Sequence, residues 1–142
     1  IRLKSRGRLR AVSPVRTSPY PGLPTDDQAL MMAALLRSRG DTVFVENLFS
    51  NRYRHVEQMK KLGAQIQVRE AAAIVSGVKA RRGAAVQATD LRGGAALVAA
   101  GLQAEGGTRV EEIHHIERGY ADIVADLAGL GACIRKEDFY ES

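Results

Sequence analysis

Tryptophan is absent from this sequence of 142 residues, which contains a single cysteine and three histidines. The lone Cys133 cannot form an internal disulfide, and His55, His114 and His115 are not spaced like a metal site. No apolar run reaches the roughly 18 residues of a membrane-spanning helix, and the basic start lacks the apolar core of a signal peptide. We therefore expect a cytoplasmic protein with no internal disulfide, no metal and no membrane.

Aromatic side chains are also scarce, at 5% of residues, although the net charge is +5. Few platforms are available for stacking bases, so the charge alone does not indicate nucleic-acid binding. The basic residues near the start alternate with leucines, as in the exposed face of a strand. Segment 1–18 is therefore predicted to be an edge strand or hairpin that turns near Ser5 to Gly7; its alternating cations are Arg2, Lys4, Arg6, Arg8 and Arg10.

The size and composition are those of one folded domain. Hydrophobic residues make up 45% and charged residues 26% of the chain, which is ordinary for a globular protein. The sequence opens on Ile1, with no methionine and no capping signal, and this predicts a piece cut from something longer.

Three short motifs recur in the same order, which indicates a duplicated unit. The pairs are Thr25-Asp26 with Thr89-Asp90, Asn51-Arg52-Tyr53 with Glu117-Arg118-Gly119-Tyr120, and Leu62-Gly63-Ala64-Gln65-Ile66 with Leu130-Gly131-Ala132-Cys133-Ile134.

Each unit is predicted to start with a helix, capped by its Thr-Asp pair, that is apolar all round and therefore buried all round. An amphipathic second helix, between core and solvent, ends at a glycine in each unit. The buried helices are expected at 29–36 and 91–104, the amphipathic ones at 52–62 and 118–130, and the strands at 42–45, 65–68, 73–78, 84–87, 108–113 and 133–135.

This pattern predicts an α/β domain whose sheets lie outside and pack onto buried helices. The two units would occupy about 19–78 and 84–138 of one domain, 1–142.

Four stretches resemble the enolpyruvyl transferase family: PYPGLPTDDQA, FSNRYRHVEQMKKLGA, VQATDLRGGAALVAAGLQAEG and IHHIERGYADIVADLAGLGA. The resemblance implies an inside-out α/β barrel-type domain of repeated βαβαββ units, of which about two of three are present here. It further implies a second domain, outside this chain, that carries a loop cysteine or aspartate and part of the phosphoenolpyruvate site.

Within the family, the motif wording is closest to the branch that transfers the enolpyruvyl group of phosphoenolpyruvate to the 3-hydroxyl of UDP-N-acetylglucosamine in peptidoglycan synthesis. The resemblance implies that no cofactor is needed. It also implies that this chain binds phosphoenolpyruvate and UDP-N-acetylglucosamine together with the missing domain. Because the groups that stabilise the transition state are shared between two domains, we expect the isolated chain to be inactive.

Asp26 has two interpretations. From its position alone it is an ordinary helix-start carboxylate, with Asp27 as a second partner of the helix dipole. The resemblance instead places Asp26 beside the sugar hydroxyl as general base or proton relay. It implies no role for Asp27.

Catalytic roles are also implied for Asp90 and Arg118, and substrate-binding roles for Thr25, Leu48, Phe49, Arg52 and Arg92. Arg92 and Arg118 would flank the phosphoenolpyruvate carboxylate, with Asp90 orienting one of them. The alternatives are a cap for Asp90, solvated arginines, and core packing for Leu48 and Phe49. We assign no role to the histidines, and we expect Cys133 to be a small buried residue.

Three rival hypotheses remain. The chain could come from an enzyme of the shikimate 3-phosphate branch, against which PTDDQA and ATDLR argue. It could be a non-catalytic basic module that binds RNA through its first strand. It could also self-associate through surfaces that a missing repeat would cover.

Overall fold

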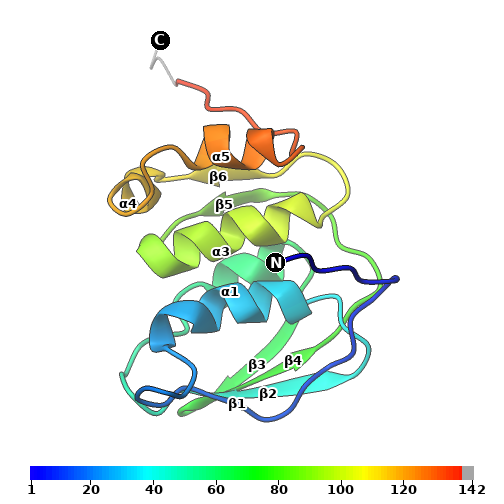
Figure 1. The fold of residues 1–142 in the computed structure, drawn as a ribbon, viewed down its shortest axis with the longest axis vertical. Helices are drawn as coiled ribbons and strands as arrows, with labels where there is room; N and C mark the ends of the chain where they lie inside the picture. The colour runs from blue at the N-terminus through cyan, green and yellow to red at the C-terminus, as the bar shows by residue number, and fades with distance from the viewer. Residues whose placement is uncertain (139–142) are drawn as a thin grey trace.

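The structure is a computed structural model that describes residues 1–138 of the chain. The described residues form a mixed α/β arrangement of helices and strands (Figure 1). The elements are β1 (Val15–Arg16), α1 (Thr25–Leu35), β2 (Asp41–Val45), α2 (Val56–Lys61), β3 (Gln65–Arg69), β4 (Ala72–Ser76), β5 (Ala85–Gln87), α3 (Leu91–Leu102), β6 (Arg109–Glu111), α4 (His114–Glu117) and α5 (Ile123–Gly129).

Two separate sheets form, and no closed barrel is present among residues 1–138. The larger sheet has the order β1-β2-β4-β3, in which β1 runs parallel to β2 and the other neighbours are antiparallel. The smaller sheet pairs β5 with β6 in parallel. Parallel pairing needs a crossover between the two strands, and α3 provides it for β5 and β6.

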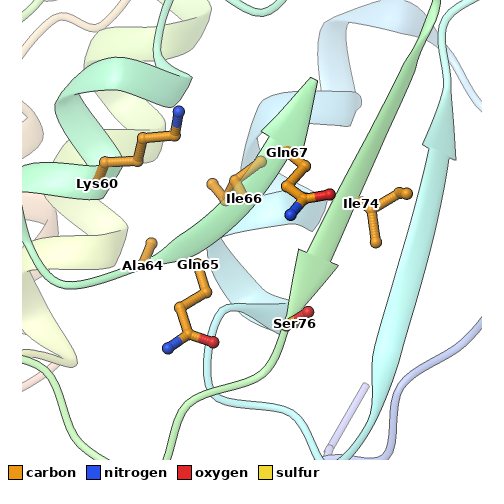
Figure 2. Close-up of a pocket in the computed structure, with 7 residues that line it drawn as sticks. All are labelled: Lys60, Ala64, Gln65, Ile66, Gln67, Ile74 and Ser76. Carbon is orange, nitrogen blue, oxygen red and sulfur yellow. The ribbon is translucent and has the colours of Figure 1, made fainter. Parts of the chain in front are cut away.

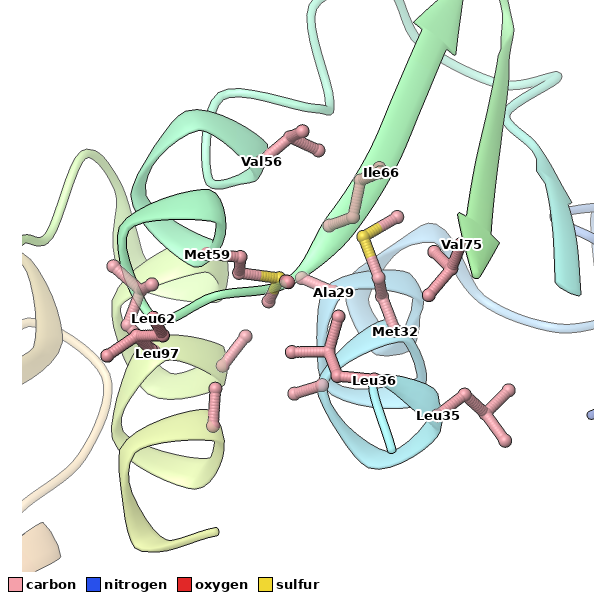
Figure 3. Packing of buried hydrophobic residues seen from close by; sticks show 14 of the residues in the cluster. Ala29, Met32, Leu35, Leu36, Val56, Met59, Leu62, Ile66, Val75 and Leu97 are labelled. Carbon is pink, nitrogen blue, oxygen red and sulfur yellow. The ribbon is translucent and has the colours of Figure 1, made fainter. Parts of the chain in front are cut away.

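Helices α1 and α3 pack side by side between the two sheets (Figure 1). The main core lies where α1, α2, α3 and the inner face of the larger sheet meet, and Met32, Leu36, Met59 and Leu97 are fully buried there (Figure 3). The prediction of central helices with sheets outside them is therefore correct for this part of the chain. Burial of α1 is less complete than predicted, because Met31 is 39% exposed.

The basic strand predicted over Arg2 to Arg10 does not form. That segment has a bend at Gly7, where φ is +78°, and a single bridge between Arg10 and Arg39. Leu3 and Leu9, the apolar positions of the alternation, are 92% and 45% exposed. Without an apolar face to bury, the alternation has nothing that would hold it as a strand.

The second unit also departs from its prediction. The helix expected over 118–130 is shorter than predicted: only α5 forms within that span, starting after Asp122, which caps it by accepting the Ala125 N–H at 2.9 Å, and the short α4 precedes the span. α5 contains no fully buried residue. The strand expected over 133–135 is absent, and Cys133, expected to be buried, is exposed.

Candidate functional site

The first turns of α1 and α3 are joined by an ion pair. Arg92, the second residue of α3, donates from Nε to Oδ1 of Asp26, the second residue of α1. Both side chains keep contact with solvent, with 37% of Arg92 and 63% of Asp26 exposed. The structure thus brings together two of the predicted site residues, which are 66 positions apart in the sequence.

A proline-rich loop fixes the point at which α1 begins. Its ends are tied by a hydrogen bond from the Ser18 N–H to the Leu23 oxygen, and Gly22 N–H closes a turn onto Pro19 oxygen. Pro24, extended with ψ at 143°, precedes the first helical residue. Because proline fixes φ and restricts the residue before it, few conformations are open to this loop.

The two helix starts are not equivalent, although their sequences repeat. Asp90 caps α3 and accepts the Gly93 N–H at 2.6 Å, whereas α1 has no side-chain cap and Asp26 lies inside its first turn. The expectation that Asp90 orients an arginine is not met by any hydrogen bond among the described residues. The prediction of a cap was right for the second unit and wrong for the first.

Arg118 lies close to this end of α3 without joining the ion pair. A Cβ built on Gly119, its neighbour, would lie 2.7 Å from Leu91 Cδ2, so the turn after α4 packs against the first residue of α3. Arg118 is exposed, and its side chain makes no hydrogen bond or ion pair within residues 1–138. Its guanidinium therefore remains available to an anion.

The loop after β2 contains the other predicted binding residues. Phe49 is 55% exposed, so core packing does not explain it, and the Arg52 guanidinium lies 4.5 Å above its ring. Such a contact is a cation–π interaction. The loop lines a depression of about 400 Å³ formed by residues 46–53 with Glu70 and Ala71.

Two buried residues of the site region, Glu46 and His55, were not predicted from the sequence. Glu46 is 5% exposed and accepts a hydrogen bond from Thr25, the first residue of α1, at 3.0 Å. The inward positions of the strand, Thr42 and Phe44, point to Glu46 as the next inward residue, so a period of two could have revealed it.

His55 is the second missed residue. It is 2% exposed, and its Nε2 has no hydrogen-bond partner in the structure. Burial lowers the pKa of His55 to about 4, although the nearby charge of Asp90 acts in the opposite direction. A Cβ built on Gly93 would lie 3.0 Å from the Cβ of His55, so His55 packs against the first turn of α3.

A second depression, of about 420 Å³, lies over β3 and β4 near Lys60 (Figure 2). None of the predicted site residues lines it. Within residues 1–138, no group of three or more His, Cys, Asp or Glu side chains is arranged to hold a metal ion. In the same part of the chain, no helix combines the length and the hydropathy needed to cross a membrane.

Similar proteins carry one name repeatedly. A protein of Desulfofundulus thermocisternus named UDP-N-acetylglucosamine 1-carboxyvinyltransferase is 45% identical over 99% of this chain, which spans 58% of that protein. Proteins of the same name from Anaeromyxobacter sp. (strain Fw109-5) and Myxococcus xanthus are 49% and 47% identical over 96% of the chain, which spans 32% of each. The chain therefore covers a part of these relatives' length.

Solved structures agree on the fold. The enolpyruvyl transferase NikO from Streptomyces tendae aligns with 90% of this chain, which covers 29% of that chain, at 30% identity and a TM-score of 0.76. An EPSP synthase from Acinetobacter baumannii aligns with 66% of this chain, which covers 24% of the synthase chain, at 23% identity and a TM-score of 0.56. This likeness supports the fold alone. The sequence model described as EPSP synthase (3-phosphoshikimate 1-carboxyvinyltransferase) matches residues 2–127. The chain belongs to this family of enolpyruvyl transferases.

Proposed function

We propose that this chain forms one wall of the active site of an enzyme that transfers the enolpyruvyl group of phosphoenolpyruvate to the 3-hydroxyl of UDP-N-acetylglucosamine, in the cytoplasm, for peptidoglycan synthesis. The name shared by relatives at 45–49% identity supports this acceptor. The chain would supply two of three βαβαββ repeats, at about 19–78 and 84–138, of an inside-out barrel-type domain.

The observation that carries the proposal is the geometry of the Arg92 guanidinium. Arg92 contacts Asp26 through Nε, and its two terminal amino groups make no other hydrogen bond within residues 1–138. Guanidinium has five N–H donors in a planar fork, so Arg92 can hold Asp26 and still bind a carboxylate. A proton acceptor and an anion-binding group are thus placed side by side.

These two groups match the chemistry that enolpyruvyl transfer requires. Asp26 takes the proton of the sugar hydroxyl as this oxygen bonds to the central carbon of phosphoenolpyruvate, whose double bond opens while its terminal CH₂ carbon takes up a proton from an acid of the second domain and becomes a methyl group. Arg92 and Arg118 hold the carboxylate of phosphoenolpyruvate, and Asp90 keeps the start of α3 in place. The methyl group of the tetrahedral intermediate then gives up a proton as phosphate leaves, which restores the double bond, and the charges of this intermediate need further cations from the second domain.

The remaining residues would contact the nucleotide sugar. Leu48 and Phe49 donate to the same Glu46 carboxylate as Thr25, and the cation of Arg52 stacks on Phe49 in the lining of the depression. An exposed aromatic ring next to a guanidinium suits a sugar linked to a diphosphate, because the ring packs on an apolar face and the cation attracts the phosphates.

The test uses two proteins. The first is the 142-residue chain, and the second is a grafted enzyme in which this chain replaces the matching 137 residues of the Anaeromyxobacter relative. Phosphate release is measured with phosphoenolpyruvate and either UDP-N-acetylglucosamine or shikimate 3-phosphate. We expect none from the chain alone, and turnover by the grafted enzyme with the nucleotide sugar. Turnover by the chain alone, or a preference for shikimate 3-phosphate, would contradict the proposal.

A further inference from the structure

Glu46 is a buried carboxylate that is held by neutral donors. It follows β2, is 5% exposed, and forms no ion pair with any Lys, Arg or His among residues 1–138. Burial of an unpaired carboxylate is costly unless its oxygens accept hydrogen bonds. The identity of its donors therefore indicates what this charge is used for.

Four donors converge on Glu46 from three segments of the chain. Its Oε1 accepts from the Thr17 hydroxyl at 2.9 Å and from the N–H groups of Leu48 and Phe49 at 3.2 and 3.4 Å. Its Oε2 accepts from the Thr25 hydroxyl at 3.0 Å. Hydrogen bonds to an ionised acceptor are stronger than those between neutral groups, so the carboxylate ties the three segments firmly together.

The direction of this network is fixed. The Thr17 oxygen accepts the Asn47 N–H at 3.0 Å, and its backbone oxygen accepts from the Asn47 side chain at 3.3 Å. The Thr17 hydroxyl proton is thus directed at Glu46. Because each hydrogen bond depends on a negative oxygen at the centre, removing the carboxylate leaves buried donors unsatisfied.

Glu46 connects the two parts of the site that the proposed function requires to be in register. Thr25 precedes Asp26 at the start of α1, and Leu48 and Phe49 form the segment that faces the acceptor. With its oxygens occupied by four donors, Glu46 is not free to take a proton from substrate. It acts through its neighbours rather than by contact with the reacting atoms.

We infer that Glu46 is a positioning residue that sets the distance between the acceptor-contacting segment Leu48–Phe49 and Asp26, and so determines how tightly the nucleotide sugar is bound. This inference rests on the proposed function for its ligand. Its structural content, the tethering of Leu48 and Phe49 to the start of α1, does not depend on that function.

The first measurement is amide hydrogen exchange, read residue by residue by NMR on the 142-residue chain. In Glu46→Ala we expect exchange at the Leu48 and Phe49 amides to rise about tenfold or more, because both lose their acceptor. In Glu46→Gln the amide oxygen still accepts from both, and the rise is under about threefold. Glu57→Ala is the matched control, since Glu57 is exposed and its ion pair within residues 1–138 is with Lys60. Unchanged exchange at both amides in Glu46→Ala would overturn the inference, whatever the enzyme does.

The second measurement uses the grafted enzyme. For Glu46→Ala we expect the KM for UDP-N-acetylglucosamine to rise about tenfold or more, with the KM for phosphoenolpyruvate changed less than about threefold, and Glu46→Gln to recover most of the loss. A general loss of structure would raise both KM values or lower kcat alone, and that result would overturn the inference.

Two further outcomes of these experiments also distinguish the inference from the proposed function. If Glu46→Ala does not fold, Glu46→Asp replaces it: this variant keeps the charge but is one methylene shorter, so we expect the same selective change, smaller in size. If the unmutated grafted enzyme does not use UDP-N-acetylglucosamine, the proposed function fails, and the exchange data alone decide whether the tether exists.

Discussion

Lowering the pH from about 8 to about 5 should weaken this fold through a single buried imidazole. The pKa of His55 is lowered from 6.5 to about 4, chiefly by burial. Because the folded state binds this proton less readily than the unfolded state does, the stabilisation is fully present above about pH 6.5 and is lost as the pH falls toward 4. The complete difference amounts to about 3 kcal/mol, of which about 2 kcal/mol is lost by pH 5.

Urea denaturation at a series of pH values measures this loss. Because carboxylates also titrate near pH 5, the informative quantity is the difference between the unmutated chain and His55→Leu, which lacks the titrating group. We expect this difference to change by about 2 kcal/mol between pH 8 and pH 5. Parallel stability curves for the unmutated chain and His55→Leu would refute the reasoning.

Three further predictions follow from packing and exposure. Gly94→Ala should destabilise the chain by about 1–3 kcal/mol in urea denaturation, because the new Cβ would lie 2.7 Å from Ile116 Cγ1. Gly129 has open space around it, so Gly129→Ala should leave stability unchanged or raise it, and equal effects of the two substitutions would contradict the prediction. The exposed Cys133 should react with a thiol reagent in the native protein at the rate of the unfolded chain, and marked protection would show that it is covered. Burial raises the pKa of Tyr53 to about 12, so this side chain should stay largely un-ionised at about pH 11, and the difference between the spectrophotometric titrations of the unmutated chain and Tyr53→Phe measures it; ionisation of Tyr53 near pH 10 would contradict the prediction.

The central helices and the first long strand could be predicted from their composition. α3 is apolar over most of its turns, and β2 is rich in β-branched residues. The prediction failed where an element lacked a partner. The alternation from Arg2 to Arg10 joins no sheet, and the helix expected over 118–130 begins only after its cap, Asp122.

Part of the candidate site could also be predicted from the sequence, and part could not. The proximity of Asp26 and Arg92 follows from a repeat that places both in the first turns of neighbouring helices, and the sequence contains that repeat. The period of two in β2 could have indicated the burial of Glu46, whereas the burial of His55 follows from the way separate segments pack and no local pattern indicates it. Their donors and neighbours, such as Thr25 and Gly93, come from elements distant in the sequence.

The measurement that tests the role of Asp26 most directly is the rate of phosphate release by the grafted enzyme with phosphoenolpyruvate and UDP-N-acetylglucosamine. Asp26→Asn is compared with Asp27→Asn, which alters an exposed neighbouring carboxylate that makes no ion pair within residues 1–138. If Asp26 takes the sugar proton, its variant lowers kcat by about 10²–10⁴-fold, while the Asp27 variant stays within about threefold of the unmutated enzyme. Equal rates for the two variants would contradict the placement of Asp26 at the reacting hydroxyl.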